Sequence, residues 1–166
     1  MLQKAKNYAI EKHQATNHKY DDYNYDFHLN MVFEVGQQFI HLVEKDEQEN
    51  VLAACWLHDI IEDARESYND VKKVTNEKVA NLVYALTNEK GRTRQERAND
   101  KYYKGILETK NASFIKFCDR IANVTYSKSI ESGMFEKYKS ENSNFVAKIY
   151  TPKCKEIANH LESLFE

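Results

Sequence analysis

The sequence predicts an all-α fold, a single helical bundle built from the whole chain of 166 residues. The chain has one proline and four glycines, which are too few for a turn-rich β fold. No segment alternates apolar and polar residues over the length of a strand. Apolar residues make up 42% and charged residues 30%, the balance of a globular protein that can bury a sizeable core. We therefore expect residues 1–166 to form one domain.

Helical periodicity predicts where the helices of this bundle lie. We expect them over residues 2–15, 27–45, 48–63, 71–74, 77–87, 94–109 and 112–127, with one or two more from residue 134 onward. The segments 18–26, rich in Tyr, Asp and Asn, and 88–94, which contains a glycine, are predicted loops. Pro152 either kinks the last helix or lies in its first turn.

Charge and cysteine content restrict the class of protein. The 24 Lys and Arg nearly balance the 26 Asp and Glu, so bulk charge does not indicate binding to nucleic acid or to a membrane. No apolar run approaches the ~18 residues of a membrane span, and the N-terminus lacks the apolar core of a signal peptide. Cys55, Cys118 and Cys154 are far apart in sequence, and we expect buried, reduced thiols. The chain is therefore predicted to be cytoplasmic.

Residues 52–63, with the sequence LAACWLHDIIED, combine an apolar helix with a dense group of polar side chains. In a continuous helix Glu62 lies four residues after His58, and Asp63 lies four after Asp59, which places these side chains on one face. An imidazole and three carboxylates are costly to bury unless a metal ion or hydrogen bonds compensate them. The segment therefore predicts a metal site.

Potential ligands come from three of the predicted helices. They are His28 on the second helix, His58 with Asp59 on the third, and Asp119 on the helix predicted over 112–127. Two imidazoles and two carboxylates suit a divalent ion such as Mn²⁺, Fe²⁺ or Zn²⁺ and leave room for water or a phosphate oxygen. Such an ion acts as a Lewis acid and lowers the pKa of bound water. No nucleophilic Ser, Cys or His arrangement is evident, so direct attack by water is the expected route.

The order His…His-Asp…Asp resembles the HD superfamily of metal-dependent phosphohydrolases. HDIIEDA (58–64) and KFCDRIANV (116–124) resemble HDxxEDT and KLADRLHNM in the hydrolase domain of RelA/SpoT enzymes, especially their small stand-alone versions. YDFH (25–28) resembles PYIxH, and HQATNHK (13–19) resembles HxGQxRK. The resemblance spans about residues 5–150. It implies an HD-type bundle and an Mn²⁺-dependent activity that removes the 3′-diphosphate of (p)ppGpp.

The resemblance also implies roles for individual side chains. The metal would be held by four of them: His28, His58, Asp59 and Asp119. Two carboxylates would position or activate the attacking water: Glu62 and Asp63. The nucleotide would be contacted by five polar side chains: Lys19, Asn123, Arg94, Arg97 and Lys101. For the four basic residues of this last group, a solvated charged face is the alternative interpretation.

Two departures from the RelA/SpoT pattern fall on the segment that recognises the base. Tyr23-Asn24-Tyr25 replaces Gly-x-Pro-Tyr, and His18 stands where an arginine is expected. A (p)ppGpp 3′-pyrophosphohydrolase is the expected function, with two alternatives. One is another HD nucleotide phosphatase, acting on the 2′-phosphate of NADPH or on a deoxynucleoside 5′-monophosphate. The other is a nucleotide-binding sensor without turnover, which the retained carboxylates after His58 argue against.

Overall fold

The computed structural model describes residues 1–166 apart from the side chain of Arg94. Its elements, in chain order, are α1 (Leu2–Ala15), β1 (Lys19–Tyr20), β2 (Tyr23–Asn24), α2 (Asp26–Gln38), a 3₁₀ turn η1 (Ile40–Leu42), α3 (Gln48–Leu57), α4 (Ile60–Asp63), α5 (Tyr68–Val74), α6 (Glu77–Leu86), α7 (Arg94–Arg97), α8 (Asp100–Glu108), α9 (Ala112–Ser129), α10 (Gly133–Ile149), a second 3₁₀ turn η2 (Pro152–Cys154) and α11 (Lys155–Ser163). The chain is mostly helical, and the predicted fold class is confirmed.

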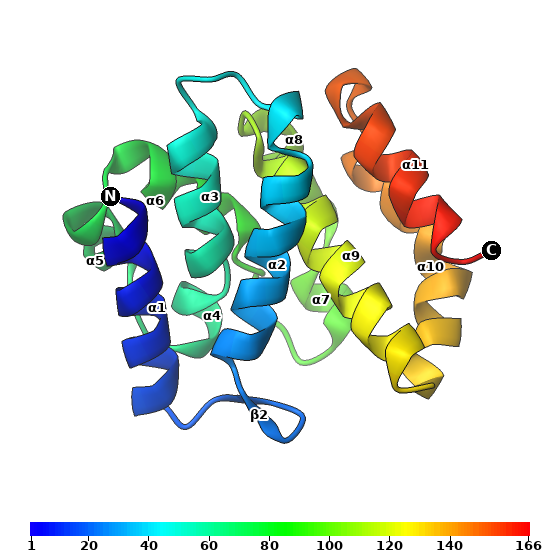
Figure 1. Ribbon diagram of the computed structural model, residues 1–166, viewed down its shortest axis with the longest axis horizontal. Coiled ribbons are helices and arrows are strands. Elements are labelled where there is room, and N and C mark those ends of the chain that lie inside the picture. Colours follow the sequence, from blue (N-terminus) through cyan, green and yellow to red (C-terminus); the bar gives the residue numbers. More distant parts are fainter.

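Three helices far apart in sequence form the centre of the bundle. Helix α2 packs against α3 and α9, while α1 and α6 cover α3 and the pair α10 and α11 covers α9 (Figure 1). Helix α3 can occupy this position because it is apolar on all sides, and every residue from Asn50 to Leu57 except Leu52 is buried. Its C-terminal end therefore carries His58 into the interior.

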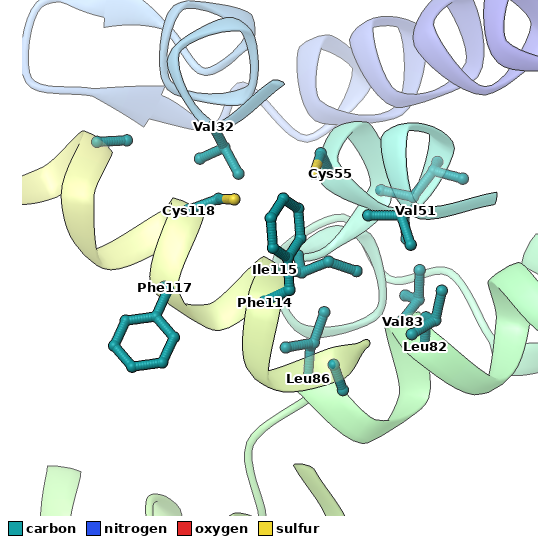
Figure 2. Close-up of a cluster of buried hydrophobic side chains, with 14 of the residues drawn as sticks. Val32, Val51, Cys55, Leu82, Val83, Leu86, Phe114, Ile115, Phe117 and Cys118 are labelled. Atoms are coloured by element: carbon teal, nitrogen blue, oxygen red, sulfur yellow. The ribbon is translucent and has the colours of Figure 1, made fainter. Parts of the chain in front are cut away.

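The buried core fixes α9 against α3 and α6. Figure 2 shows apolar side chains of these helices and of α2 packed together: Val32, Val51, Cys55, Leu82, Val83, Leu86, Phe114, Ile115 and Cys118. Phe117 points to the opposite side of α9, where its ring contacts Phe145 of α10. Burying one large apolar side chain stabilises the fold by roughly 1.5–3 kcal/mol, so the cluster holds these helices in one arrangement. The three cysteines are buried and free, as predicted. Because Asp119 directly follows Cys118, the core also determines where Asp119 lies.

The prediction of one continuous helix over 48–63 is wrong at the His58-Asp59 pair. Helix α3 ends at Leu57, and a separate short helix, α4, begins at Ile60. Asp59, with φ of −103° and ψ of 1°, leaves the helical region. At this break both polar side chains turn toward buried partners, His58 toward the Cys55 carbonyl and Asp59 toward Tyr25. These contacts replace the regular helical face that the spacing predicted.

Other boundaries also differ from the predicted ones. The helix predicted over 27–45 ends at Gln38, and only the short turn η1 follows it. The helix predicted over 94–109 is divided because Asn99 accepts a hydrogen bond from the Tyr102 amide (3.1 Å) and caps α8. Pro152 lies in the first turn of η2, which is one of the two predicted alternatives.

The predicted loop over 18–26 contains a minimal antiparallel hairpin. Its strands pair Lys19 with Asn24 and Tyr20 with Tyr23. Two-residue strands are too short to show an alternating pattern, which is why the sequence did not reveal them. Across the part of the chain that the structure describes, no helix has the length and apolar character needed to cross a membrane.

Candidate metal centre

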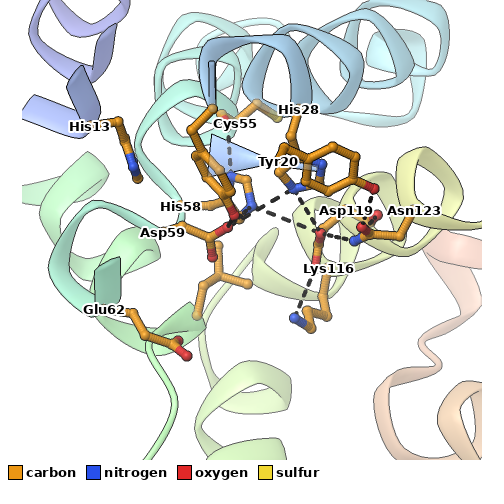
Figure 3. Close-up of polar contacts among 12 residues, drawn as sticks. His13, Tyr20, His28, Cys55, His58, Asp59, Glu62, Lys116, Asp119 and Asn123 are labelled. Carbon is orange, nitrogen blue, oxygen red and sulfur yellow. Dashed lines mark hydrogen bonds and ion pairs between the residues drawn. The ribbon is translucent and has the colours of Figure 1, made fainter. Parts of the chain in front are cut away.

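Side chains from α2, from the break between α3 and α4, and from α9 converge in the interior (Figure 3). One ligand atom each from His28, His58 and Asp119 lies within 4.8 Å of the others. Asp119 Oδ1 is 3.3 Å from His28 Nε2 and 3.8 Å from His58 Nε2. The two imidazoles are almost fully buried, with 2% and 3% of their side-chain surfaces exposed. We call this group the His28–His58–Asp119 cluster.

The ring of His58 is oriented by the turn that precedes it. Its Nδ1 lies 2.9 Å from the carbonyl oxygen of Cys55. A carbonyl only accepts, so Nδ1 carries a proton and Nε2 faces the carboxylates. Asp59 Oδ2 lies 2.9 Å from His58 Nε2, but the two atoms are not aligned for a hydrogen bond. His58 Nε2 is therefore buried without a hydrogen-bond partner. A buried imidazole nitrogen among carboxylates with poorly aligned contacts is what a divalent cation would satisfy.

Asp59 lies against the two imidazoles of the cluster. Its Oδ2 is 2.9 Å from His58 Nε2 and 3.9 Å from His28 Nε2, and it accepts a hydrogen bond from the hydroxyl of Tyr25. The three ligand atoms that all lie within 4.8 Å of one another come from His28, His58 and Asp119. The assignment of Asp59 as a fourth ligand stays a prediction.

Opposite charges offset the cost of burial in this cluster. Burial alone would lower the pKa of His58, but the carboxylates of Asp59 and Asp119 outweigh it and raise that pKa to about 9. For Asp119, burial would raise the pKa, whereas Lys116 and the two imidazoles hold it well below its usual range. The charge of His58 likewise holds the pKa of Asp59 below its usual range, so both carboxylates are ionised at neutral pH. His58 is protonated in the metal-free cluster, and a cation that binds to its Nε2 displaces that proton.

Asp119 is held by neighbours on its own helix. Lys116 Nζ lies 2.9 Å from Asp119 Oδ2, and Asn123 Nδ2 donates to Asp119 Oδ1 at 2.7 Å. Tyr20 of the hairpin donates to Asn123 Oδ1 at 2.8 Å and stacks on His28 at 4.8 Å between ring centroids. For the tyrosines between residues 20 and 25 the sequence allows two interpretations, stacking on a base or packing of the loop over the first helices. Lys116 was not predicted to take part, although it lies three residues before Asp119 on a helix.

Lys116→Met should destabilise the metal-free protein by about 2 kcal/mol, since it leaves a largely buried carboxylate without its cation. The Lys116 side chain is 21% exposed and that of Asp119 13%, so water screens the pair only partly. The free energy of unfolding is measured by urea titration with a chelator present. Lys139→Met, at an exposed position of α10, is the matched control. Equal stability of the two variants would contradict the structural role given to Lys116.

An aromatic stack closes the side of the cluster formed by α1 and the hairpin. Tyr25 stacks on His13 (4.6 Å between centroids) and on His18 (3.9 Å). His13 is 1% exposed, and burial lowers its pKa to about 4. The sequence did not reveal this packing of His13, because its partners, His18 and Tyr25, lie outside α1. His18, which stands in place of the expected arginine, is thus packed into this stack.

Tyr25→Phe should weaken metal binding by roughly 10-fold, the lower end of the effect seen when a group supporting a metal ligand is removed. Only the hydroxyl that donates to Asp59 is lost, while the ring keeps its stacking on His13 and His18. Manganese affinity is measured by isothermal titration calorimetry. Tyr23→Phe, on the same hairpin with 50% of its surface exposed, should bind manganese like the unmodified chain. If Tyr25→Phe also bound manganese like the unmodified chain, the hydroxyl of Tyr25 would make no contribution to metal binding.

The two carboxylates after the break have different surroundings. Glu62 is exposed and lies apart from the His28–His58–Asp119 cluster in Figure 3. Its two oxygens accept from the amide nitrogen of Asn88 (3.2 Å) and from Asn88 Nδ2 (2.8 Å). Asp63 is partly buried, and burial together with the charges of Asp59 and Glu62 raises its pKa to about 7. Their catalytic roles stay predictions.

Two of the four basic residues predicted to contact substrate, Lys19 and Lys101, have partners of their own. Lys19 donates to Asn24 Oδ1 across the hairpin, and Lys101 Nζ lies 3.0 Å from Glu89 Oε1 with its side chain 79% exposed. Arg97 lies at the end of α7, and the side chain of Arg94 is outside the described residues. Contacts of these four residues with a substrate stay predictions.

The helical bundle and the His28–His58–Asp119 cluster are consistent with a bundle of the HD-domain type. No family model matches the chain. Two known proteins named guanosine-3′,5′-bis(diphosphate) 3′-pyrophosphohydrolase MESH1 are similar to it. The one from Drosophila melanogaster is 34% identical over 76 residues, which cover 46% of this chain and 42% of the relative. The one from Danio rerio is 27% identical over 118 residues, which cover 71% of this chain and 64% of the relative.

The chain is therefore a distant homologue of the MESH1 hydrolases, and the predicted resemblance is confirmed. The matched segments span roughly half of each relative's length, 42% of one and 64% of the other.

Proposed function

We propose that this chain is a metal-dependent phosphohydrolase that removes the 3′-diphosphate of (p)ppGpp as pyrophosphate. The observation that carries the proposal is the convergence of His28, His58 and Asp119 ligand atoms within 4.8 Å in a nearly dry interior. The distant homology to proteins named for this reaction supports the choice of substrate. Mn²⁺ is the proposed ion, and Fe²⁺ and Zn²⁺ suit the same donor set.

Each residue near the cluster would have one role in hydrolysis. The cluster and Asp59 would hold the ion, which supplies Lewis acidity and lowers the pKa of water when bound. Asp63, with a pKa of about 7, is suited to accept the proton of the attacking water, because a general base works best near the operating pH. Glu62, fixed by Asn88, would orient that water. The water oxygen bonds to phosphorus, the bond from phosphorus to the ribose 3′-oxygen breaks, and that oxygen takes a proton.

Substrate contacts complete the proposal. Asn123, already bonded to Asp119 and Tyr20, is placed beside the cluster and would contact the sugar or a phosphate. The basic residues would stabilise negative charge on the diphosphate. They are Lys19, Arg94, Arg97 and Lys101.

One observation favours a second candidate substrate. His18 stacks on Tyr25 in the segment where the RelA/SpoT pattern has a base-recognising arginine. A packed imidazole offers fewer directed donors than a free guanidinium, so discrimination in favour of guanine would be weaker. The 2′-phosphate of NADPH or a deoxynucleoside 5′-monophosphate is then the alternative substrate of the same metal site.

Product release from a substrate panel tests the proposal. The chain is incubated with Mn²⁺ and ppGpp, NADPH or deoxynucleoside monophosphates, and pyrophosphate and orthophosphate are assayed separately. Pyrophosphate from ppGpp alone is the expected result. Orthophosphate from NADPH or a deoxynucleotide would contradict (p)ppGpp as the substrate, while it would still support hydrolysis at the proposed metal site. Nucleotide binding without any product would contradict the hydrolase and indicate a sensor.

A further inference from the structure

A polar cavity lies between α7, α8, α9 and α10, away from the His28–His58–Asp119 cluster. Its volume is about 370 Å³, and its lining includes Gln95, Tyr103, Arg120, Lys137 and Lys148. No residue of the cluster is among the residues that line it. Arg120 follows Asp119 on α9, but its side chain faces α10 and not the metal centre. The cavity is therefore a separate place for a ligand.

Arg120 is the central group of this cavity. Only 8% of the residue is exposed, and its guanidinium lies over the rings of Phe145 (4.1 Å) and Tyr138 (4.7 Å). Its Nη1 is buried and makes no hydrogen bond, and Glu141 Oε2 lies 3.5 Å from it. The ion pair with Glu141 and the two rings hold the guanidinium in one position, and Arg120 is one of the residues that line the cavity. Arg120 therefore brings a fixed positive charge to the wall of the cavity.

The charges around the cavity are predominantly positive. Among the lining residues that the structure describes, Lys137 and Lys148 join Arg120, and Glu141 is the one carboxylate. Lys148 Nζ lies 4.7 Å above the ring of Tyr103, which holds it beside the opening. Three cations against one carboxylate suit an anion of more than one negative charge. The fork of an arginine matches phosphate oxygens in particular.

We propose that this cavity binds the phosphate group of a small phosphorylated molecule, with Arg120 as the buried anchor and Lys137 and Lys148 at the rim. A volume of about 370 Å³ is at the lower end of small-molecule sites, which suits a pyrophosphate or a phosphorylated sugar. The aromatic rings of Tyr138 and Phe145 hold the planar guanidinium in place. The proposal does not depend on the reaction at the metal centre.

Calorimetric titration of the chelator-treated full chain with inorganic pyrophosphate tests this site, because chelation removes any binding through a metal. One pyrophosphate per chain is expected. The double variant Lys137→Gln/Lys148→Gln should bind at least about 10-fold more weakly, a loss of about 1.4 kcal/mol. The matched control, Lys139→Gln/Lys155→Gln, changes the net charge equally at exposed positions outside the cavity and should bind like the unmodified chain.

Two single variants sharpen the test. Glu141→Gln removes the carboxylate beside Arg120 and should tighten binding. Arg120→Lys keeps the charge but loses the fork and should weaken binding, with circular dichroism checking that the chain is folded. Absence of binding to the unmodified chain would overturn the proposal. Equal binding by the Lys137→Gln/Lys148→Gln variant, or equal loss in the control pair, would overturn it as well, since either result means that this cavity is not the site.

Discussion

Asp119→Asn is expected to abolish metal binding and to lower phosphohydrolase turnover by more than about 100-fold, because loss of a ligand should exceed the 10–100-fold effect of losing a supporting group. The substitution removes the negative charge that lies 3.3 Å from His28 Nε2 and 3.8 Å from His58 Nε2. Two imidazoles facing a neutral amide form a much poorer cation site. Manganese binding by equilibrium dialysis and product release from ppGpp are the two measurements.

A control for Asp119→Asn must separate loss of the metal from loss of the fold. The variant also leaves Lys116 without its carboxylate, so its far-ultraviolet circular dichroism and thermal unfolding are compared with those of the unmodified chain. Asp100→Asn, at an exposed position in the first turn of α8, is the matched substitution and should retain binding and turnover. A folded Asp119→Asn protein that bound manganese normally would rule Asp119 out as a ligand.

Glu62→Gln and Asp63→Asn are each expected to reduce turnover by about 10²–10⁴-fold, the range for loss of a positioned acid or base. Metal affinity should change little, because neither carboxylate is among the three converging ligand atoms. This separation of turnover from metal binding distinguishes a catalytic carboxylate from a ligand. Turnover numbers are measured at saturating manganese, and affinity is measured by the same dialysis.

The matched control for these carboxylates is Glu77→Gln. Glu77 begins α6 and pairs at the surface with Lys72, 3.3 Å away, and exposed pairs of this kind contribute little. Its turnover should equal that of the unmodified chain. If Asp63→Asn had normal turnover while Glu62→Gln did not, the proton would go to Glu62, and the role given to Asp63 would be wrong. Normal turnover in both variants would remove both residues from the mechanism.

The sequence was sufficient for the fold class and for the three side chains that converge, His28, His58 and Asp119. Periodic apolar positions predicted the helices of α1, α6 and α9 to within one or two residues of their observed ends. The motifs that carry His28, His58 and Asp119 placed a polar group on each of three apolar helices, and burial of such groups requires compensation. These signals are local, and each is visible in a short stretch of sequence.

What the sequence did not reveal depends on contacts between distant elements. The helix breaks at His58 because its ring bonds back to Cys55 and because Asp59 meets Tyr25 from another element. Spacing rules assume a regular helix, so they placed Glu62 on the face of His58, whereas the structure pairs Glu62 with Asn88. Tertiary contacts of this kind override local pattern.

The supporting residues were hidden for the same reason. The hydroxyl of Tyr20 donates to Asn123, which lies 103 positions later in the sequence. The ring of His13 is covered by His18 and Tyr25, which flank the hairpin and are not on the helix of His13. The cavity at Arg120 was equally invisible, because an arginine next to an aspartate suggests a surface ion pair. Burial against Phe145 becomes apparent only once α10 is packed on α9.

His28, His58 and Asp119 are proposed to bind one divalent ion. The most direct measurement is anomalous diffraction at the manganese edge from crystals of the unmodified chain grown with Mn²⁺. We expect one strong anomalous peak within bonding distance of His28 Nε2, His58 Nε2 and a carboxylate oxygen of Asp119. A peak at another place, or fully ordered crystals with no peak in this cluster, would contradict the account.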